Sequence, residues 1–241
     1  MCVLLAGCYT TAGSACEYRD HNITIDFGHT PVVDSACSGV IAAIKFFEDA
    51  GYDDRFTVNI TVADEVFTYM KNENSGADIP IQIFGRYNGE TNQIDMSAFG
   101  TEYMNTRTAW NTVADDPNSG MEITEEIWTG VITHETSHAL ATAVYNRLNP
   151  VMVSNGYYIS NGASEFIAYM IQLSTTREKL RNEIIESFDN PEGFTSIWSL
   201  NPIVHYTHPH RFGVQSYNTN NSMEWFHNAL HGKIQTDLPN I

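Results

Sequence analysis

One long run of residues constrains the fold of this chain more than any other feature. The run EEIWTGVITHETSHALATAVYNRL contains no proline, and it ends at Asn149-Pro150, where a helix cannot readily continue. Two helix starts fit the residues before it: Ser119 with Glu122 forms a capping-box pattern, and Thr124 is an alternative N-cap. Around its centre the only acidic or basic side chains are two histidines and Glu135, which permits burial. The sequence therefore predicts one long, buried helix.

Two histidines on this predicted helix are spaced to bind one metal ion. His134 and His138 lie four residues apart, so their imidazoles leave the same face of the helix one turn apart. Glu135 lies beside that face, where its carboxylate can accept a proton from water whose acidity a Zn²⁺ ion raises. The spacing thus permits a metal site at His134 and His138 with Glu135 as a base beside it, and the alternative is a helix whose histidines bind no metal.

A third ligand is needed, because a catalytic zinc ion has three protein ligands and leaves its fourth position for water or substrate. Glu165 is the best candidate, since it lies 27 residues after His138, at the start of the next predicted helix, GASEFIAYMIQL. Its small neighbours Ala163, Ser164 and Ala168 would let the two helices approach closely. The alternative is an ordinary first-turn glutamate that the helix dipole favours.

The two segments HETSH and NGASEFIA resemble the motifs of zincin metallopeptidases, specifically of the gluzincin branch, in which the helix after the active-site helix supplies a glutamate ligand. The resemblance extends to the order of parts from Thr57 to Leu173, although only the two motifs are specific. It implies that the two histidines and Glu165 bind zinc and that Glu135 is the general base. Asn161-Gly162 stands where gluzincins often have Glu-Gly, which leaves the ligand in place.

Peptide hydrolysis also requires a hydrogen-bond donor for the oxyanion that develops beside the metal. Tyr217 precedes SMEWFHNALHG in a pattern that resembles the tyrosine-then-helix segment at the end of many compact gluzincins, so its hydroxyl is the first candidate. His210 and Tyr206, in the predicted loop NPIVHYTHPHRFG, are the next candidates. His205, His208 and His210 could alternatively form a second metal site, although their spacing fits no closed tetrahedral set.

The rest of the chain predicts an α+β fold. HNITIDF and TVNITVAD alternate like strands, and between them a helix begins near Asp34 and ends near Gly51. The stretch from Ile79 to Phe99 contains two strand-like runs around Asn88-Gly89, as in a hairpin or a sheet edge.

After the two motif helices, a charged helix, REKLRNEIIESF, and a short final helix, SMEWFHNALHG, are expected. The fold class predicted is thus zincin-like, with an N-terminal α/β lobe that holds a small mixed sheet and a mainly helical C-terminal lobe. We expect a single domain over residues 16–241, with lobes at 16–118 and 119–241.

Residues 1–15 resemble the end of an export signal. In MCVLLAGC the last four residues resemble a bacterial lipobox, in which Cys8 would carry a lipid and become the mature N-terminus. Alternatively, ordinary cleavage after Gly13-Ser14-Ala15 would leave Cys16 first, or the segment is a buried element of a cytoplasmic protein. After either cleavage Cys16 and Cys37 remain as the unmodified pair, which an oxidising compartment would join in a disulfide. No later run is long and apolar enough for a membrane span, so membrane attachment would be through lipid alone.

The charge of the chain narrows the choice of partner. Twelve Lys and Arg against 29 Asp and Glu give a net charge of −17 spread along the sequence, which argues against nucleic acid as a partner.

Taken together, the motifs and the N-terminal segment predict an exported zinc metallopeptidase of the bacterial cell envelope, acting on peptides or proteins. The alternative is a non-catalytic envelope protein whose zinc site is structural or whose cleft only binds a peptide; a fourth protein ligand, such as His210, would favour it. A zinc-free scaffold is a third interpretation.

Overall fold

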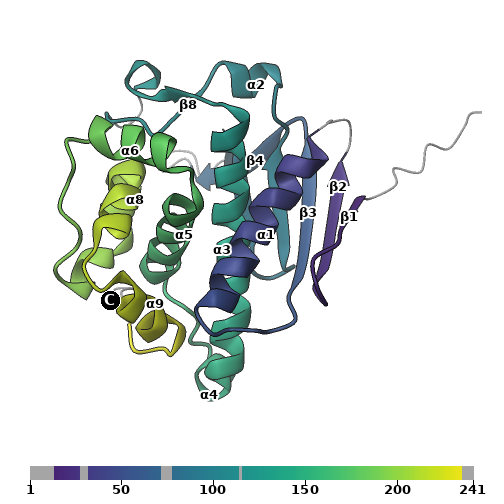
Figure 1. Cartoon of the computed structure of the whole chain (residues 1–241), viewed down its shortest axis with the longest axis vertical. Coiled ribbons are helices and arrows are strands. Elements are labelled where there is room, and N and C mark those ends of the chain that lie inside the picture. Colours follow the sequence, from purple (N-terminus) through teal and green to yellow (C-terminus); the bar gives the residue numbers. More distant parts are fainter. Residues whose placement is uncertain (1–13, 28–31, 72–77, 114–115, 235–241) are drawn as a thin grey trace, which may run out of the picture.

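The computed structural model describes residues 14–27, 32–71, 78–113 and 116–234, so the possible lipobox at Cys8 lies outside the described residues. Figure 1 shows a mixed sheet on one side of the molecule, a helical C-terminal half on the other, and the long helix α3 (Glu125–Leu148) between them. The predicted α+β class, with a small mixed sheet followed by a mainly helical half, is confirmed.

The main sheet contains three parallel strands flanked by an antiparallel strand on each edge. In spatial order the strands are β1 (Ser14–Cys16), β2 (Asn22–Phe27), β3 (Thr57–Ala63), β7 (Gln93–Ser97) and β6 (Gly85–Asn88). Alternation along β3 places Val58, Ile60 and Val62 in the core, as a half-buried strand requires. The predicted hairpin at Asn88-Gly89 is the β6–β7 pair, and β6 forms an edge of the sheet.

Two smaller antiparallel pairs lie outside this sheet: β4 (Val66–Lys71) with β5 (Asp78–Ile83), and β8 (Thr108–Ala109) with β9 (Met121–Glu122). The prediction missed β4. It also treated the residues from Ile79 onward as part of the hairpin, whereas residues 78–83 form β5, which pairs with β4, and the hairpin begins at Gly85. Pro80 lacks an N–H donor, and Ile79 is exposed, so this strand suits a two-stranded ribbon rather than the interior of a sheet.

The helical half follows the prediction except at two places, the short helix directly after Asn149 and the segment from Asn201 to Gly213. Besides α3, the helices are α1 (Val33–Asp49), α2 (Glu102–Asn105), α4 (Pro150–Ser154), α5 (Asn161–Thr175), α6 (Glu178–Ser187), α7 (Pro202–Thr207), α8 (Pro209–Asn218) and α9 (Ser222–Leu230), with single 3₁₀ turns at Pro117–Ser119 (η1) and Ile197–Leu200 (η2). The predicted loop NPIVHYTHPHRFG was wrong, because it contains α7 and the start of α8. Pro202 and Pro209 each begin a helix, where the missing N–H costs nothing. Among the described residues no helix is long and apolar enough to cross a membrane.

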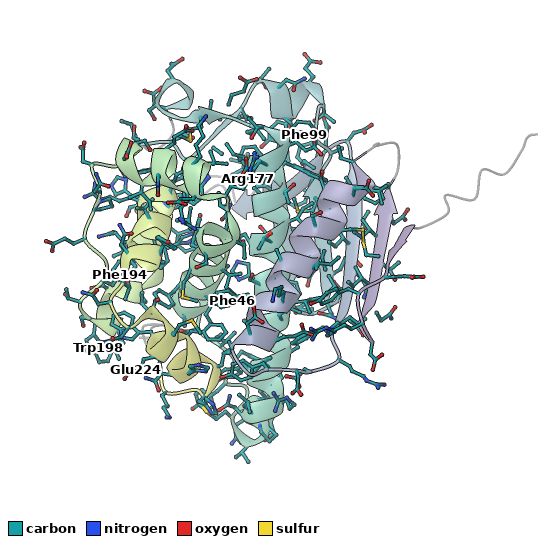
Figure 2. The ribbon with its side chains drawn as sticks, viewed as in Figure 1. Phe46, Phe99, Arg177, Phe194, Trp198 and Glu224 are labelled. Carbon is teal, nitrogen blue, oxygen red and sulfur yellow. A yellow bond between two sulfur atoms is a disulfide. The ribbon has the colours of Figure 1, made fainter. Side chains whose placement is uncertain are left out.

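Aromatic contacts join the N-terminal part to the last helix. Phe46 and Phe47 of α1 pack edge-on against Phe226 of α9, with ring centroids 5.7 Å and 5.3 Å apart. Figure 2 shows Phe46 at this junction between the two parts of the chain. One hydrophobic core therefore extends from Cys16 in the first strand to Ile234 after α9.

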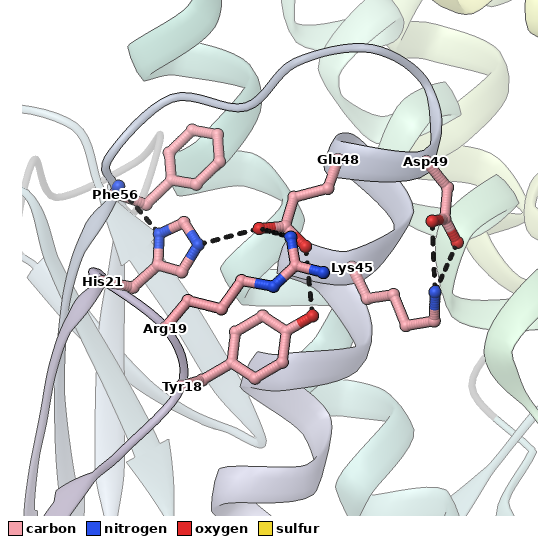
Figure 3. A network of polar contacts seen from close by, with 7 residues as sticks. All are labelled: Tyr18, Arg19, His21, Lys45, Glu48, Asp49 and Phe56. Carbon is pink, nitrogen blue, oxygen red and sulfur yellow. Dashed lines mark hydrogen bonds and ion pairs between the residues drawn. The ribbon is translucent and has the colours of Figure 1, made fainter.

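The first hairpin is fastened to α1 at two points. The predicted disulfide between Cys16 and Cys37 is present and joins β1 to α1. Glu48, near the end of α1, accepts a hydrogen bond from the Tyr18 hydroxyl at 3.0 Å, and its carboxylate contacts Arg19 at 2.7 Å and His21 at 3.1 Å (Figure 3). The disulfide holds the hairpin to the first half of α1, and the bonds to Glu48 hold it to the end of α1.

Candidate metal centre and cleft

The helix α3 contains His134, Glu135 and His138, and hydrogen bonds fix both its first residue and its orientation against the sheet. The Thr124 hydroxyl accepts the N–H of Ile127 at 3.3 Å, so Thr124 rather than the Ser119 capping box is the N-cap. The indole N–H of Trp128, which is fully buried, donates to the carbonyl of Ser97 at the end of β7 at 2.9 Å. This bond holds α3 against the sheet and sets which face of the helix turns toward the edge strand.

The next long helix, α5, brings Glu165 to the histidines. Ala163 and Ala168 are fully buried in α5, and such small residues let α3 and α5 lie close together. His134, His138 and Glu165 are mostly shielded from solvent, with side-chain exposures of 11%, 12% and 23%. The three predicted ligands therefore come together at one point although two helices supply them.

The spacing of the ligand atoms fits a metal ion. Nε2 of His134 lies 3.1 Å from Nε2 of His138 and 3.4 Å from Oε2 of Glu165, and Nε2 of His138 lies 3.7 Å from Oε1 of Glu165. Bonds of about 2.1 Å in a tetrahedral arrangement separate neighbouring ligand atoms by about 3.4 Å. This group could therefore bind a metal ion, and among the described residues it is the only cluster of three His, Cys, Asp or Glu side chains whose ligand atoms all lie within 4.8 Å of one another.

Hydrogen bonds behind the imidazoles orient them toward this point. Nδ1 of His134 lies 3.2 Å from Oε1 of Gln172, and Nδ1 of His138 lies 2.7 Å from the Ser164 hydroxyl. With a proton on each Nδ1 donated to these oxygens, both Nε2 lone pairs face the same point, which is the tautomer that a metal ligand requires. Gly130 makes room for the amide, because a Cβ there would lie 3.2 Å from Nε2 of Gln172.

The carboxyl groups of the site differ in electrostatic environment. Burial raises the pKa of Glu135 to about 7, despite the opposing effect of His134. Burial would also raise the pKa of Glu165, but His138 and His134 lower it to about 2. At neutral pH Glu165 is therefore an anion between imidazoles, whereas Glu135 is near its titration point, an electrostatic contrast found in many catalytic sites.

The edge strand β6 passes directly over Glu135. The carbonyl of Phe84 accepts the N–H of Ser97 from the β7 side, so by alternation the main-chain groups of Gly85 and Tyr87 face away from the sheet. The backbone of Tyr87 hydrogen-bonds the Glu135 carboxylate. A Cβ at Gly85 would lie 2.5 Å from Sδ of Met96 and 3.1 Å from Cγ of Glu135, so only glycine allows this close approach.

Two cavities meet at His134, Glu135 and Gly85. The first, called the polar cavity here, has a volume of about 700 Å³, and its wall includes Arg86, Glu90, Thr142, Asn146, Tyr158 and Asn161. The second, the aromatic cavity, has a volume of about 460 Å³, and its wall includes Phe84, Tyr103, Trp110, Val131, Tyr169 and His210. The metal ligands and Glu135 thus lie in a cleft that continues on both sides of them.

The structure separates the candidate oxyanion donors. Tyr217, on α8, lies beneath the guanidinium of Arg181 at 5.5 Å and lines neither cavity, so it is not brought to the metal ligands. Tyr206 is 72% exposed and lines neither cavity. His210 does line the aromatic cavity; its Nδ1 accepts the N–H of Asn111 at 2.9 Å, which leaves the imidazole proton on Nε2. Burial lowers the pKa of His210 to about 4, so this imidazole is neutral at pH 7.

The three histidines at 205, 208 and 210 do not form a second metal site in the described structure, because they have different surroundings. His208 is exposed between α7 and α8, whereas His210 contacts Asn111 and the Trp110 ring. His205 instead reaches the first site, with Nε2 3.4 Å from Oε2 of Glu165.

Sequence reasoning missed Gln172 and the approach of His205 to Glu165. Gln172 had a signal: it is a polar residue in the apolar run of α5, seven residues after Glu165 and so on the same face of the helix. His205 had none, because its segment was predicted as a loop.

Comparison with known proteins identifies the family but no function. A model of a family of unknown function, DUF6639, matches residues 23–239, which is most of the chain, so the chain belongs to this family. Searches of curated proteins and of solved structures find no significant match.

Proposed function

We propose that this member of the family is a zinc-dependent peptidase. Its main support is geometric: two imidazoles and a carboxylate, with one ligand atom from each lying within 4.8 Å of the others, adjoin Glu135 in a cleft that the edge strand β6 also lines. Two imidazoles and one carboxylate are the ligands of many catalytic zinc sites, and this set leaves a position for water or substrate. Zinc held by His134, His138 and Glu165 would supply Lewis-acid activation of water and of the scissile carbonyl.

The residues around the ligands have separate tasks in this proposal. Glu135 accepts the proton of the attacking water and passes it to the leaving amine, while the backbone of Tyr87 holds its carboxylate in place. His210, whose proton is on Nε2, donates a hydrogen bond from the wall of the aromatic cavity to the developing oxyanion. We therefore assign the role predicted for Tyr217 to His210.

The substrate in this proposal is a peptide in an extended conformation. The outward N–H and C=O of Gly85 and the C=O of Tyr87 can pair with a further strand, while the Tyr87 N–H donates to Glu135, and such pairing binds a peptide largely through its backbone. A peptide on this edge passes over Glu135 and reaches both cavities. We also propose export, since a disulfide such as Cys16–Cys37 persists in oxidising compartments; a lipid anchor at Cys8 is part of the same proposal.

The test of this function is Glu135→Gln with a matched change in the polar cavity, Glu90→Gln. Loss of general acid–base catalysis should lower the rate of peptide hydrolysis about 10²- to 10⁴-fold in Glu135→Gln. Bound zinc, measured by elemental mass spectrometry, should remain. Glu90→Gln removes an exposed carboxylate from the same cleft and should leave most of the activity. Unchanged hydrolysis in Glu135→Gln would rule out the proposed mechanism.

A further inference from the structure

The carboxylate of Glu165 has two imidazole neighbours on one oxygen. Oε2 lies 3.4 Å from Nε2 of His134 and also 3.4 Å from Nε2 of His205. The first of these imidazoles belongs to the metal-ligand cluster, and the second does not. His205 therefore approaches the proposed ligand from outside the cluster.

The position of His205 is set by its own helix and by an aromatic wall. The Asn201 side chain caps α7 by accepting the N–H of Val204 at 3.1 Å, which fixes the start of this short helix. The His205 ring packs against Phe212 and Tyr169, with centroid distances of 5.4 Å and 6.0 Å. Its side chain is only 14% exposed, so the ring is held in place rather than moving in solvent.

Although Glu165 lines the polar cavity, His205 lies outside both cavities of the cleft. Its polar contact with the site is through the Glu165 carboxylate, and its other neighbours include the rings of Tyr169 and Phe212. Outer hydrogen-bond donors of this kind hold a ligating carboxylate in one orientation and commonly improve metal affinity.

We propose that His205 is a positioning residue for the metal: its Nε2–H donates to Oε2 of Glu165 and holds this carboxylate in the orientation that binds the ion. The proposal rests on the ligand role of Glu165 in the proposed function, but not on peptide hydrolysis. It also links the C-terminal helices to the metal centre, because α7 supplies the donor and Phe212 of α8 supports its ring.

Two substitutions separate the donor from the shape of the ring. His205→Phe keeps an aromatic ring against Phe212 but removes the donor, and His205→Gln keeps an N–H donor of similar reach. The zinc dissociation constant, measured by competition with a chromophoric chelator, should rise about 10- to 100-fold in His205→Phe. It should return to within a few-fold of wild type in His205→Gln. Tyr206→Phe is the matched control, because Tyr206 is the exposed next residue and should not alter affinity.

A second measurement excludes a merely structural role. Thermal unfolding of the metal-free proteins should be nearly the same for wild type and His205→Phe, since the ring packing is kept and the His134 and His138 imidazoles still lie beside the Glu165 carboxylate. An affinity within twofold of wild type in His205→Phe would overturn the inference. So would a loss as large as that of Glu165→Ala, which would make His205 a ligand itself. Zinc binding without peptide hydrolysis would refute the proposed function and leave this inference standing, whereas a wild type that binds no metal would refute both.

Discussion

The two cavities that meet at Glu135 differ in their walls. The polar cavity contains the candidate metal ligands, and its wall combines charged and amide side chains with Tyr87, Tyr158 and Ile159. The aromatic cavity is smaller and enclosed largely by rings, with His210 among them. In the proposed function, a bound peptide would therefore meet charged and amide side chains in one cavity and more aromatic rings in the other.

From this difference we infer which residue of a peptide substrate the cleft would select. β6 begins beside the aromatic cavity at Gly85 and runs toward Glu90 in the polar cavity, so a peptide paired with it crosses from one to the other. A ring-lined cavity gains free energy by burying an apolar side chain, whereas a wide polar cavity accepts many hydrated side chains. We expect the residue next to the scissile bond on the aromatic side to decide which peptides are cut.

The largest effect that we expect in the aromatic cavity is that of replacing His210. Its replacement by alanine removes the proposed oxyanion donor and should lower kcat about 10²- to 10³-fold, with zinc content unchanged. Steady-state kinetics on one peptide substrate measure this effect.

Tyr217→Phe is the control for this prediction. The Tyr217 ring lies beneath Arg181 and outside both cavities, so loss of its hydroxyl should leave kcat near the wild-type value. A low kcat in Tyr217→Phe with a normal kcat in His210→Ala would instead assign oxyanion stabilisation to Tyr217, and His210 in the aromatic cavity would then have no part in the mechanism.

A smaller effect concerns the size of the aromatic cavity. For peptides that differ only in the residue on that side, leucine or phenylalanine should exceed alanine in kcat/KM by about 10- to 200-fold. Val131→Phe adds a ring to the cavity wall and should reduce this ratio toward one, as competition between paired peptides would show.

The matched change is Ile159→Phe in the polar cavity, which should keep the preference for large apolar residues. An equal loss of preference in both variants would mean that the two cavities do not divide the substrate between them.

Much of the site could be predicted because its residues are close in sequence or lie at helix starts. His134 and His138 share one face of any helix that contains them, and the bounds of α3 were indicated by the cap residue Thr124 and by Pro150. Glu165 could be placed because α5 begins shortly before it. The Cys16–Cys37 disulfide was also predicted correctly, since few cysteines were available to pair.

The remainder depends on contacts between segments that are distant in sequence. A loop was predicted from Asn201 to Gly213, whereas Pro202 and Pro209 each begin a helix there that packs against α5. This error concealed the approach of His205 to Glu165. The choice between Tyr217 and His210 likewise depended on which face of α8 turns toward the cleft, and no local pattern decides that.

The most direct test of the central claim is the metal content of protein prepared without added zinc. Elemental mass spectrometry on wild type should find about one zinc per chain, as a site with three protein ligands predicts. In Glu165→Ala the zinc should be lost or greatly weakened, because two imidazoles alone bind it poorly. A well-folded wild type with no stoichiometric metal would contradict the zinc site at His134, His138 and Glu165, and the segment HETSH would then be only part of a buried helix.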